Sequence, residues 1–414
     1  MALISSDFRL ELDLPPSCMA FCPHDPQYLV VGTYHLNRQE DANQSDTQDE
    51  DHQRQKRTGS LILLKVVQAH VTICQTLTTD FGILDLHFQP SISEAHGHGQ
   101  APRETCTSRG QLCVATSTGS LQIYQIKRGM NQGDTPYIVH SSTYQFFPKE
   151  VLVLSFAWHP LLANIVCATL SDGRVTICRL RSQEQSDMLE GDSVHTDNLV
   201  RVVEHDLEAW ISAFTPDGSI LFSGGDDAVL SYVPLNLPRD YPIFEASRDS
   251  TQPAVADLPS SPSWRDKKVH QAGVTSILPV LQNITITGSY DDHIRVLSTP
   301  ASGRRQVLAE KNLGGGVWRL GVLEGPSYGS DMDSSVRYLV LASCMYAGIR
   351  IVEIRCDRGS DWTIEILARF EEHQSMNYAS DMHPLHSDER KMIVSTSFYD
   401  KLLCIWHFGD DSSP

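Results

Sequence analysis

The stretch from Val269 to Leu320 decides how the rest of the chain is interpreted. It begins V-H-Q-A-G-V-T-S-I (269–277), continues I-T-I-T-G-S-Y-D-D-H-I-R-V-L (284–297) and ends G-G-G-V-W-R-L (314–320). His270 precedes a short β-branched run, and a tight Gly-Ser-Tyr-Asp-Asp turn separates the next two runs. A histidine, a strand, a tight turn that carries an aspartate and a further strand are typical of one blade of a β-propeller.

Six other segments repeat this pattern of short apolar runs and Gly, Asp or Asn turns. No long segment with a 3.6-residue period separates them, which disfavours a parallel α/β sheet. Closure into a ring also removes exposed sheet edges. We therefore predict a single all-β domain over 1–414, a seven-bladed WD-repeat-like β-propeller. The six segments are 19–34, 83–124, 154–178, 210–227, 316–354 and 377–406.

Polar segments interrupt the repeats. They are rich in Ser, Pro, Asp and Glu, and they cannot bury enough apolar area to offset the entropy of ordering. We expect them to be long disordered inserts. One of them carries His96-Gly97-His98, but two imidazoles in such a loop are weak evidence for a metal site. We predict neither a metal nor a cofactor. The inserts are expected at about 37–58, 91–110, 182–198, 238–268 and 325–335.

Composition restricts the kind of partner. The chain of 414 residues has a formal net charge of −18, whereas nucleic-acid binding requires clustered Lys and Arg. The ten cysteines are scattered and several lie in apolar runs, which indicates buried reduced thiols. No signal-peptide pattern opens the chain, and no apolar run approaches the ~20 residues that span a bilayer. We expect a cytoplasmic monomer that neither binds nucleic acid nor inserts into membranes.

Three histidine–aspartate pairs have a structural interpretation. WD-repeat blades place a histidine before the first strand and an aspartate in the second turn, as a hydrogen-bonded brace inside the blade. Trp406 follows the last of these aspartates, where such a brace expects a tryptophan. We interpret the pairs as buried polar groups that fix each blade. They are His205 with Asp226, His270 with Asp291, and His373 with Asp400.

Other aromatic and acidic residues are not explained by the blades. An acid follows the expected brace aspartate in two blades, as Asp227 and Asp292, and the glycine run 314–316 leads to Trp318 and Arg319. Tyrosines in turns can simply fill space, but an aromatic box with carboxylates suits a quaternary ammonium, by cation–π attraction of ~1–2 kcal/mol per desolvated face. Four tyrosines lie in the corresponding turn of four blades, which converge on one face of a propeller: Tyr34, Tyr290, Tyr346 and Tyr399.

Several motifs together resemble the WD-repeat diphthine methyl ester hydrolases of diphthamide biosynthesis. The most specific are G-T-Y-H-L (32–36) and G-G-G-V-W-R (314–319), and the resemblance extends from about Met19 to Phe408. It implies an esterase that removes the methyl ester of methylated diphthine on translation elongation factor 2, before amidation to diphthamide. The implied substrate carries a trimethylammonium beside the ester, in agreement with the aromatic and acidic face. Supporting motifs are 223–227, 270–274, 287–294, 342–346 and 397–400.

Ester hydrolysis requires a nucleophile or an activated water, a proton acceptor and donors for the oxyanion. The preferred hypothesis is a water activated by Asp292 or His293, with Arg319 and amides of the glycine run stabilising the oxyanion. Cys344 is an alternative nucleophile, although a small core residue is the simpler interpretation. The string G-P-S-Y-G (325–329) matches G-x-S-x-G, but its polar surroundings lack the strand and helix of a nucleophile elbow.

Two other functional classes stay open. Most propellers are non-catalytic scaffolds, for instance in complex assembly or endosomal trafficking. A transcription or chromatin adaptor is disfavoured by the absence of basic patches. Methanol release from elongation factor 2 that carries methylated diphthine distinguishes an esterase from a scaffold.

Overall fold

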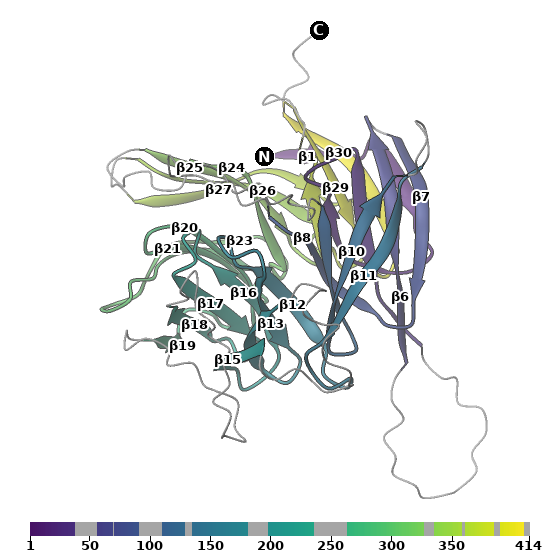
Figure 1. Ribbon diagram of the computed structural model, residues 1–414. Helices are drawn as coiled ribbons and strands as arrows, with labels where there is room; N and C mark the ends of the chain where they lie inside the picture. Colours follow the sequence, from purple (N-terminus) through teal and green to yellow (C-terminus); the bar gives the residue numbers. More distant parts are fainter. Residues whose placement is uncertain are drawn as a thin grey trace, which may run out of the picture.

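The computed structural model describes residues 1–37, 56–68, 70–90, 110–128, 135–180, 198–235, 263–326, 335–357, 361–384 and 390–409. Their regular elements are all strands, which form seven sheets (Figure 1). The predicted all-β, seven-bladed propeller is therefore confirmed. Within these ranges, no helix has the length and apolarity that crossing a bilayer requires.

The first three blades follow the order of the chain, each from its inner to its outer strand. Blade one contains β3 (Pro16–Phe21), β4 (Tyr28–Thr33), β5 (His35–Leu36), β6 (Arg57–Val67) and β7 (His70–Thr79). Blade two contains β8 (Ile83–Phe88), β9 (Gln111–Thr116), β10 (Ser120–Lys127) and β11 (Tyr137–Gln145). Blade three contains β12 (Val153–Trp158), β13 (Ile165–Leu170), β14 (Arg174–Arg179) and β15 (Leu199–Glu204).

The next three blades have the same antiparallel order. Blade four contains β16 (Ala209–Phe214), β17 (Ile220–Gly225), β18 (Leu230–Pro234) and β19 (Trp264–Asp266). Blade five contains β20 (Val274–Leu281), β21 (Ile284–Ser289), β22 (His293–Ser298) and β23 (Gln306–Asn312). Blade six contains β24 (Arg319–Glu324), β25 (Val336–Ser343), β26 (Ile349–Cys356) and β27 (Trp362–Phe370).

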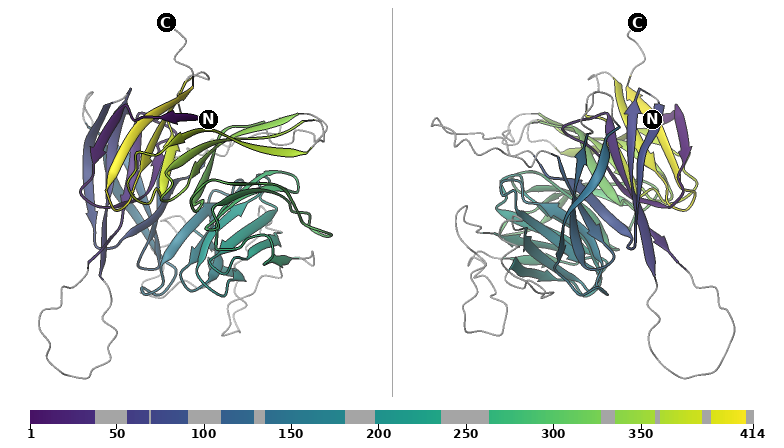
Figure 2. Two further views of the ribbon diagram at one scale, coloured as in Figure 1. Left: turned by 180° about the vertical axis from the view of Figure 1, so that it is seen from behind. Right: turned by 45° about the vertical axis from the view of Figure 1, so that its right-hand side comes forward.

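Both ends of the chain build the last blade and so close the ring. β28 (Ala379–Met382), β29 (Arg390–Thr396) and β30 (Leu402–Gly409) are completed by β2 (Phe8–Glu11), which pairs antiparallel with β30. β1 (Ala2–Ile4) pairs in parallel with β27 of blade six. In Figure 2 the purple N-terminal strands accordingly lie beside the yellow and yellow-green C-terminal strands.

Polar side chains of the inner strands connect adjacent blades around the channel. In three of the six connections given below, a serine or threonine hydroxyl bonds to a backbone carbonyl of an adjacent blade and so satisfies buried polar groups at the blade junction. In two further connections, an aspartate carboxylate accepts a hydrogen bond from the adjacent blade. The connections are Ser17 to Ile83 O, Ser155 to Asp85, Ser212 to Cys167 O, Thr275 to Val317 O, Ser343 to Ser380, and Phe21 N to Asp381.

The described cysteines are free, and all except Cys74 are buried, as their place in apolar runs predicted. Two predicted inserts were assigned too far: Arg57 and Thr58 begin β6, and Trp264–Asp266 forms β19, the outer strand of blade four. Trp264 stacks there on Tyr232 at 5.0 Å, and apolar burial of this kind orders the segment. Most of the other insert residues, including His96, His98 and Ser327, lie outside the described residues.

In blade seven the predicted brace residues bond to serines and backbone rather than directly to each other. His373 Nε2 lies 2.8 Å from Ser395 Oγ, and Trp406 Nε1 donates to the same oxygen at 3.0 Å. Asp400 accepts the backbone N–H of Gln374 at 3.0 Å. In blade five, His270 Nε2 contacts Thr287 Oγ1 at 2.9 Å, while Asp291 accepts the N–H of Gln271.

The predicted pairing of His205 with Asp226 is wrong by one residue. His205 Nδ1 bonds to Asp227 Oδ1 at 2.9 Å, and Asp206 N donates to Asp227 Oδ2 at 3.0 Å. The strand register explains the shift: Ala209 pairs with Gly225 as Val274 pairs with Ser289. Asp227 therefore corresponds to Asp291, and Asp226 occupies the position that Tyr290 takes in the next blade. The unbraced acid of blade four is Asp226 rather than Asp227.

Candidate active site

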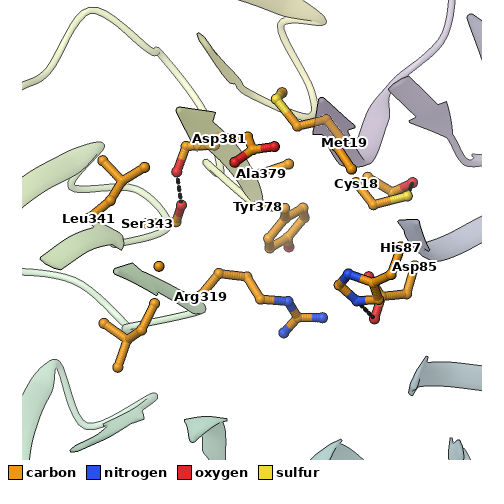
Figure 3. Close-up of a pocket in the computed structure, with 15 residues that line it drawn as sticks. Cys18, Met19, Asp85, His87, Arg319, Leu341, Ser343, Tyr378, Ala379 and Asp381 are labelled. Carbon is orange, nitrogen blue, oxygen red and sulfur yellow. Dashed lines mark hydrogen bonds and ion pairs between the residues drawn. The ribbon is translucent and has the colours of Figure 1, made fainter. Parts of the chain in front are cut away.

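A cavity of about 230 Å³ opens in the central channel, where inner strands of four blades meet. Its walls combine two carboxylates, one guanidinium, an imidazole and a phenol with apolar side chains, as Figure 3 shows. The lining comes from β3, β8, β24 and β28 and the residues beside them: Ser17–Ala20, Asp85, His87, Arg319–Gly321, Leu341, Ser343 and Tyr378–Asp381. We call this space the channel cavity.

Asp85 and His87 are joined by a hydrogen bond on one wall of the channel cavity. His87 Nε2 lies 3.2 Å from Asp85 Oδ2, and Ser155 donates to the same oxygen at 2.6 Å. Burial opposes ionisation of Asp85, but the charges of His87 and Arg319 and these hydrogen bonds hold its pKa at about 2. Asp85 is therefore a fixed negative charge, poorly suited to exchange protons near neutral pH.

Asp381 has the opposite electrostatic character. It accepts the backbone N–H groups of Phe21 at 2.9 Å and Met382 at 2.8 Å, and no salt bridge joins it to a cation among the described residues. Burial raises its pKa to about 6, despite those hydrogen bonds and the charge of His87. A carboxyl with a pKa this close to neutrality can take up and release a proton at physiological pH.

Arg319 supplies the positive charge of the channel cavity. Its Nη1 donates to the carbonyls of Thr275 at 3.3 Å and Trp318 at 3.1 Å, and its Cζ lies 4.8 Å from the centroid of the Trp318 ring. Figure 3 shows the guanidinium extending across the cavity toward His87 and Asp85. Because these contacts fix one edge of the guanidinium, the remaining N–H groups can donate to a carbonyl oxygen in the cavity.

Aromatic rings form a continuous group beside the channel cavity, which we call the aromatic cluster. Trp318 lies at its centre, 5.1 Å from Tyr378, 5.9 Å from Tyr290 and 5.5 Å from Trp210. Tyr378 also lines the cavity, so the aromatic cluster and the cavity share a wall. The members of the aromatic cluster are Tyr34, Trp210, Tyr290, Trp318, Tyr378, Phe398 and Tyr399.

The structure brings together most of the aromatic residues that the sequence singled out. Tyr34 and Tyr399 both contact Phe398, at 6.3 and 5.1 Å between ring centroids, and Tyr290 joins them through Trp318 and Tyr378. Tyr346 makes a different contact and donates to Asp292 Oδ2 at 3.2 Å. Tyr346 and Tyr399 are exposed, by 59% and 69%. Tyr290 is half-buried.

The predicted catalytic residues do not share one place. Arg319 lines the channel cavity, whereas Asp292, His293 and Cys344 are absent from its lining. Asp292 has a left-handed backbone, φ 66°, and faces Tyr346. His293 Nδ1 donates to the carbonyl of Asp291 at 2.6 Å.

Cys344 is fully buried in blade six, and its thiol donates to the carbonyl of Ala342. Burial raises the pKa of Cys344 to about 12, so almost no thiolate forms near neutral pH. These are the surroundings of a structural thiol rather than of a nucleophile.

Asp227, which was predicted to bind substrate, is bonded within its own blade. Both of its carboxylate oxygens are used, by His205, Asp206 N and Arg265. Burial opposes its ionisation, but those partners hold the pKa of Asp227 at about 2. Asp227 therefore stabilises its blade, and the acid beside the aromatic cluster is Asp226, which accepts Trp210 Nε1 at 3.1 Å.

Several site residues escaped sequence reasoning: Asp85, His87, Trp210, Tyr378, Asp381 and Phe398. A usable indication existed in the inner strands, where Asp85 and Asp381 interrupt otherwise apolar or small-residue runs. Buried acids in such strands require partners and so mark a special environment. Among the described residues, no group of three or more His, Cys, Asp or Glu side chains is arranged to hold a metal ion.

Comparison with solved structures supports the fold alone. A chain in the crystal structure of the mitotic checkpoint complex matches with a TM-score of 0.59 and 12% identity, over 99% of this chain and 94% of that one. Chaetomium thermophilum Sqt1, solved with the N-terminus of ribosomal protein L10, matches with a TM-score of 0.54 and 14% identity, over 98% of this chain and 100% of that one. Both are similar propellers at low sequence identity.

Comparison with curated sequences is more specific, although no protein-family model matches the chain. The diphthine methyltransferase of Schizosaccharomyces pombe is 30% identical over 309 residues, which are 71% of this chain and 74% of the relative. The Saccharomyces cerevisiae protein of that name is 24% identical, over 95% of both chains. A Dictyostelium discoideum homolog is 25% identical, over 95% of this chain and 97% of its own. The chain belongs to the diphthine methyltransferase family.

Proposed function

We propose that this protein is a carboxylesterase that hydrolyses the methyl ester of methylated diphthine on translation elongation factor 2, the step before amidation to diphthamide. The observation that carries the proposal is the shared wall between the aromatic cluster and the channel cavity, formed by Tyr378. Aromatic faces suit the trimethylammonium of such a substrate, and Arg319 suits the carbonyl of its ester. We expect the protein to act as a cytoplasmic monomer with elongation factor 2 as its protein partner.

Asp381 is the proposed general base. Its carboxylate takes a proton from a water molecule, and the oxygen of that water adds to the ester carbonyl carbon. Arg319 donates hydrogen bonds to the tetrahedral oxyanion. The C–OCH₃ bond then breaks, Asp381 returns the proton to the departing methoxide, and methanol leaves. The carboxylic acid product loses its own proton to solvent, so one ester and one water yield one carboxylate, one methanol and one proton.

The names of the relatives describe a methyl transfer, which is the second candidate. The size of the channel cavity favours hydrolysis. Pockets for cofactors and drug-sized ligands usually enclose about 300–1,000 Å³, whereas this cavity has about 230 Å³. A side-chain-sized ester and a water fit such a space better than a side chain together with a bulky methyl donor.

Methanol release from elongation factor 2 that carries methylated diphthine tests the proposal. Purified protein without any methyl donor should release one methanol per modified residue. The Asp381→Asn variant should release it at least about 100-fold more slowly, because a positioned base contributes about 10²–10⁴ in rate. Glu365→Gln, an exposed acid on β27, provides a charge-matched control that should keep the parental rate.

The rival assignments are tested in the same assay. Loss of activity in Asp292→Ala together with full activity in Asp381→Asn would indicate that Asp292, rather than Asp381, is the base. Absence of methanol release from the parent protein, with its fold verified, would refute the esterase and favour methyl transfer or a scaffold.

A further inference from the structure

Two hydrogen-bond donors that line the channel cavity have no carboxylate bonded to them in the described part of the chain. Arg319 uses Nη1 for the carbonyls of Thr275 and Trp318, and it forms no salt bridge with a described residue. The hydroxyl of Tyr378 forms no hydrogen bond with any residue that the structure describes, although its side chain is half-buried. Burial raises the pKa of Tyr378, so the hydroxyl keeps its proton. Figure 3 shows the Tyr378 ring and the Arg319 guanidinium facing the same space.

This pair of donors suits the carboxylate of a small ligand. A guanidinium offers parallel N–H groups to the two oxygens of a carboxylate, and a phenol can donate to one of those oxygens. A neutral carbonyl would gain less, because hydrogen bonds between charged partners are about twice as strong as those between neutral ones. The donors of the channel cavity therefore favour an anion over a neutral ligand of the same shape.

The rest of the lining limits the ligand to a short chain with an apolar end. The cavity of about 230 Å³ has room for roughly seven non-hydrogen atoms, at the ~30 Å³ that a water molecule occupies. Met19, Ala20, Leu320 and Leu341 supply apolar side chains. Propionate and butyrate have this size and one apolar end, whereas a dicarboxylate would place a second charge against the apolar wall.

The charges around the cavity couple such an anion to a proton. Asp85 already opposes the charge of Arg319, so a bound anion adds net negative charge unless a carboxyl is protonated. Asp381 is that carboxyl, because burial holds its pKa at about 6. An anion in the same small cavity raises this pKa further, since two like charges disfavour each other. The ionisable side chains of the lining are Cys18 on β3, Asp85 and His87 on β8, Arg319 on β24, Tyr378 before β28, and Asp381 on β28; β25 and β29 contribute none to it.

We propose that the channel cavity binds short-chain monocarboxylate anions, with Arg319 and Tyr378 donating to the carboxylate, and that Asp381 takes up a proton when the anion binds. The inference goes beyond the proposed hydrolysis, because binding requires neither an ester nor a reaction. Since the protonated form of Asp381 favours the anion, the affinity should rise as the pH falls from 7.5 to 6.0.

The probe is sodium propionate, with propionamide as its neutral isostere. Each is titrated onto the purified protein at constant ionic strength, and binding is followed by ligand relaxation in NMR. Propionate should bind at pH 6.0 with a Kd on the order of 1–10 mM, and propionamide at least about tenfold more weakly. Tyr378→Phe removes only the hydroxyl and should weaken propionate about tenfold, and Arg319→Met should weaken it at least as much. Tyr137→Phe, at an exposed tyrosine of β11, is the matched control and should leave the Kd unchanged.

Asp381→Asn should change the affinity in the opposite direction. The parent should bind propionate about fivefold more tightly at pH 6.0 than at pH 7.5. Asparagine is neutral at both pH values, so the variant should bind about tenfold more tightly than the parent at pH 7.5 and lose most of the pH dependence. A gain of affinity of this kind does not arise from damage to the fold.

The outcomes separate the two parts of the inference. Equal Kd values for propionate and propionamide, or an unchanged Kd in Tyr378→Phe and Arg319→Met, would overturn the carboxylate site. A parental affinity that does not vary with pH, or no gain in Asp381→Asn, would overturn the coupling to a proton. None of these measurements uses methanol release, so their failure is distinguishable from a failure of the proposed esterase.

Discussion

Replacing Asp381 with asparagine tests the chemistry and the electrostatics of the channel cavity together. Asp381 accepts backbone N–H groups from Phe21 and Met382, and burial raises its pKa from 3.8 to about 6. Asparagine keeps the shape of the side chain and one acceptor oxygen, but it cannot take up a proton. The substitution therefore removes the proposed base with little change in volume.

The shifted pKa sets the expected effect on stability. Because the folded-state pKa lies above the unfolded-state value, this carboxyl stabilises the fold most at low pH, and that contribution is lost as the pH rises from about 4 through 6. A shift from 3.8 to about 6 corresponds to about 3 kcal/mol at pH 7.5. Asparagine avoids this cost but leaves one backbone N–H without an acceptor, at about 1–3 kcal/mol.

We therefore expect the free energy of unfolding of Asp381→Asn to lie within about 2 kcal/mol of that of the parent at pH 7.5. Its stability relative to the parent should decrease by about 2 kcal/mol between pH 7.5 and pH 4.5, because the parent regains its proton. Urea unfolding at both pH values measures this difference. Methanol release should fall about 10²–10⁴-fold in the variant, and kcat/KM of the parent should decline below about pH 6.

Two results would refute this reasoning. A variant with parental activity and the parental decline below pH 6 would show that Asp381 is not the base. A stability difference that does not change between the two pH values would show that the carboxyl is not held in a buried, unpaired state.

Three further predictions concern other parts of the molecule. Arg319→Met should lower kcat about 10²–10³-fold with little change in KM or urea midpoint, because an oxyanion donor acts in the transition state; an unaltered kcat would exclude that role. His373→Ala removes the bonds to Ser395 and Ser397 and should cost about 2–4 kcal/mol by urea unfolding. Since burial lowers the pKa of His373 to about 4, the parent should lose stability as the pH falls from 6.5 through 4, and this slope should weaken in the variant. Gly288→Ala places a Cβ 2.5 Å from Val317 Cγ1 and should cost about 1–3 kcal/mol, whereas Gly321→Ala meets no atom within 4 Å and should be nearly neutral; equal effects on the melting temperature would contradict this packing.

The blades were predictable because each is encoded locally. A β-branched run, a tight turn and a second run specify a hairpin without distant contacts, and seven such units have few ways to close. β17 and β21 both end at the expected turns, at Gly225 and Ser289. The one-residue error at Asp226 arose because the sequence D-D does not reveal which aspartate faces the histidine. The left-handed residue that ends the turn decides this: Ala228 in blade four and Asp292 in blade five.

The channel cavity was not predictable in the same way, because its residues come from four blades. Asp85 and Asp381 are far apart in the sequence, and each follows residues that read as an ordinary inner strand. Their electrostatic characters differ only after folding. His87 and Arg319 both lower the pKa of Asp85, whereas for Asp381 burial outweighs the effect of His87 and, in the described part of the chain, no salt bridge forms. Such differences depend on long-range neighbours, which no local pattern contains.

The two acids of the channel cavity also connect blades, so a substitution at either one affects both the stability of a blade junction and the chemistry of the cavity. Asp85 accepts Ser155 of blade three, and Asp381 accepts Phe21 N of blade one, so each carboxylate fixes a blade junction and faces the cavity. A junction fixed by a side chain of the cavity holds that side chain rigidly, which favours a preorganised site. A loss of activity after substitution is therefore ambiguous unless stability is measured at the same pH. Above pH 6, replacing Asp381 with asparagine should lower the rate of hydrolysis, because the base is lost. The same substitution removes a buried charge and so removes a cost to the free energy of unfolding. A loss of activity without a matching loss of stability distinguishes a catalytic carboxylate from a structural one.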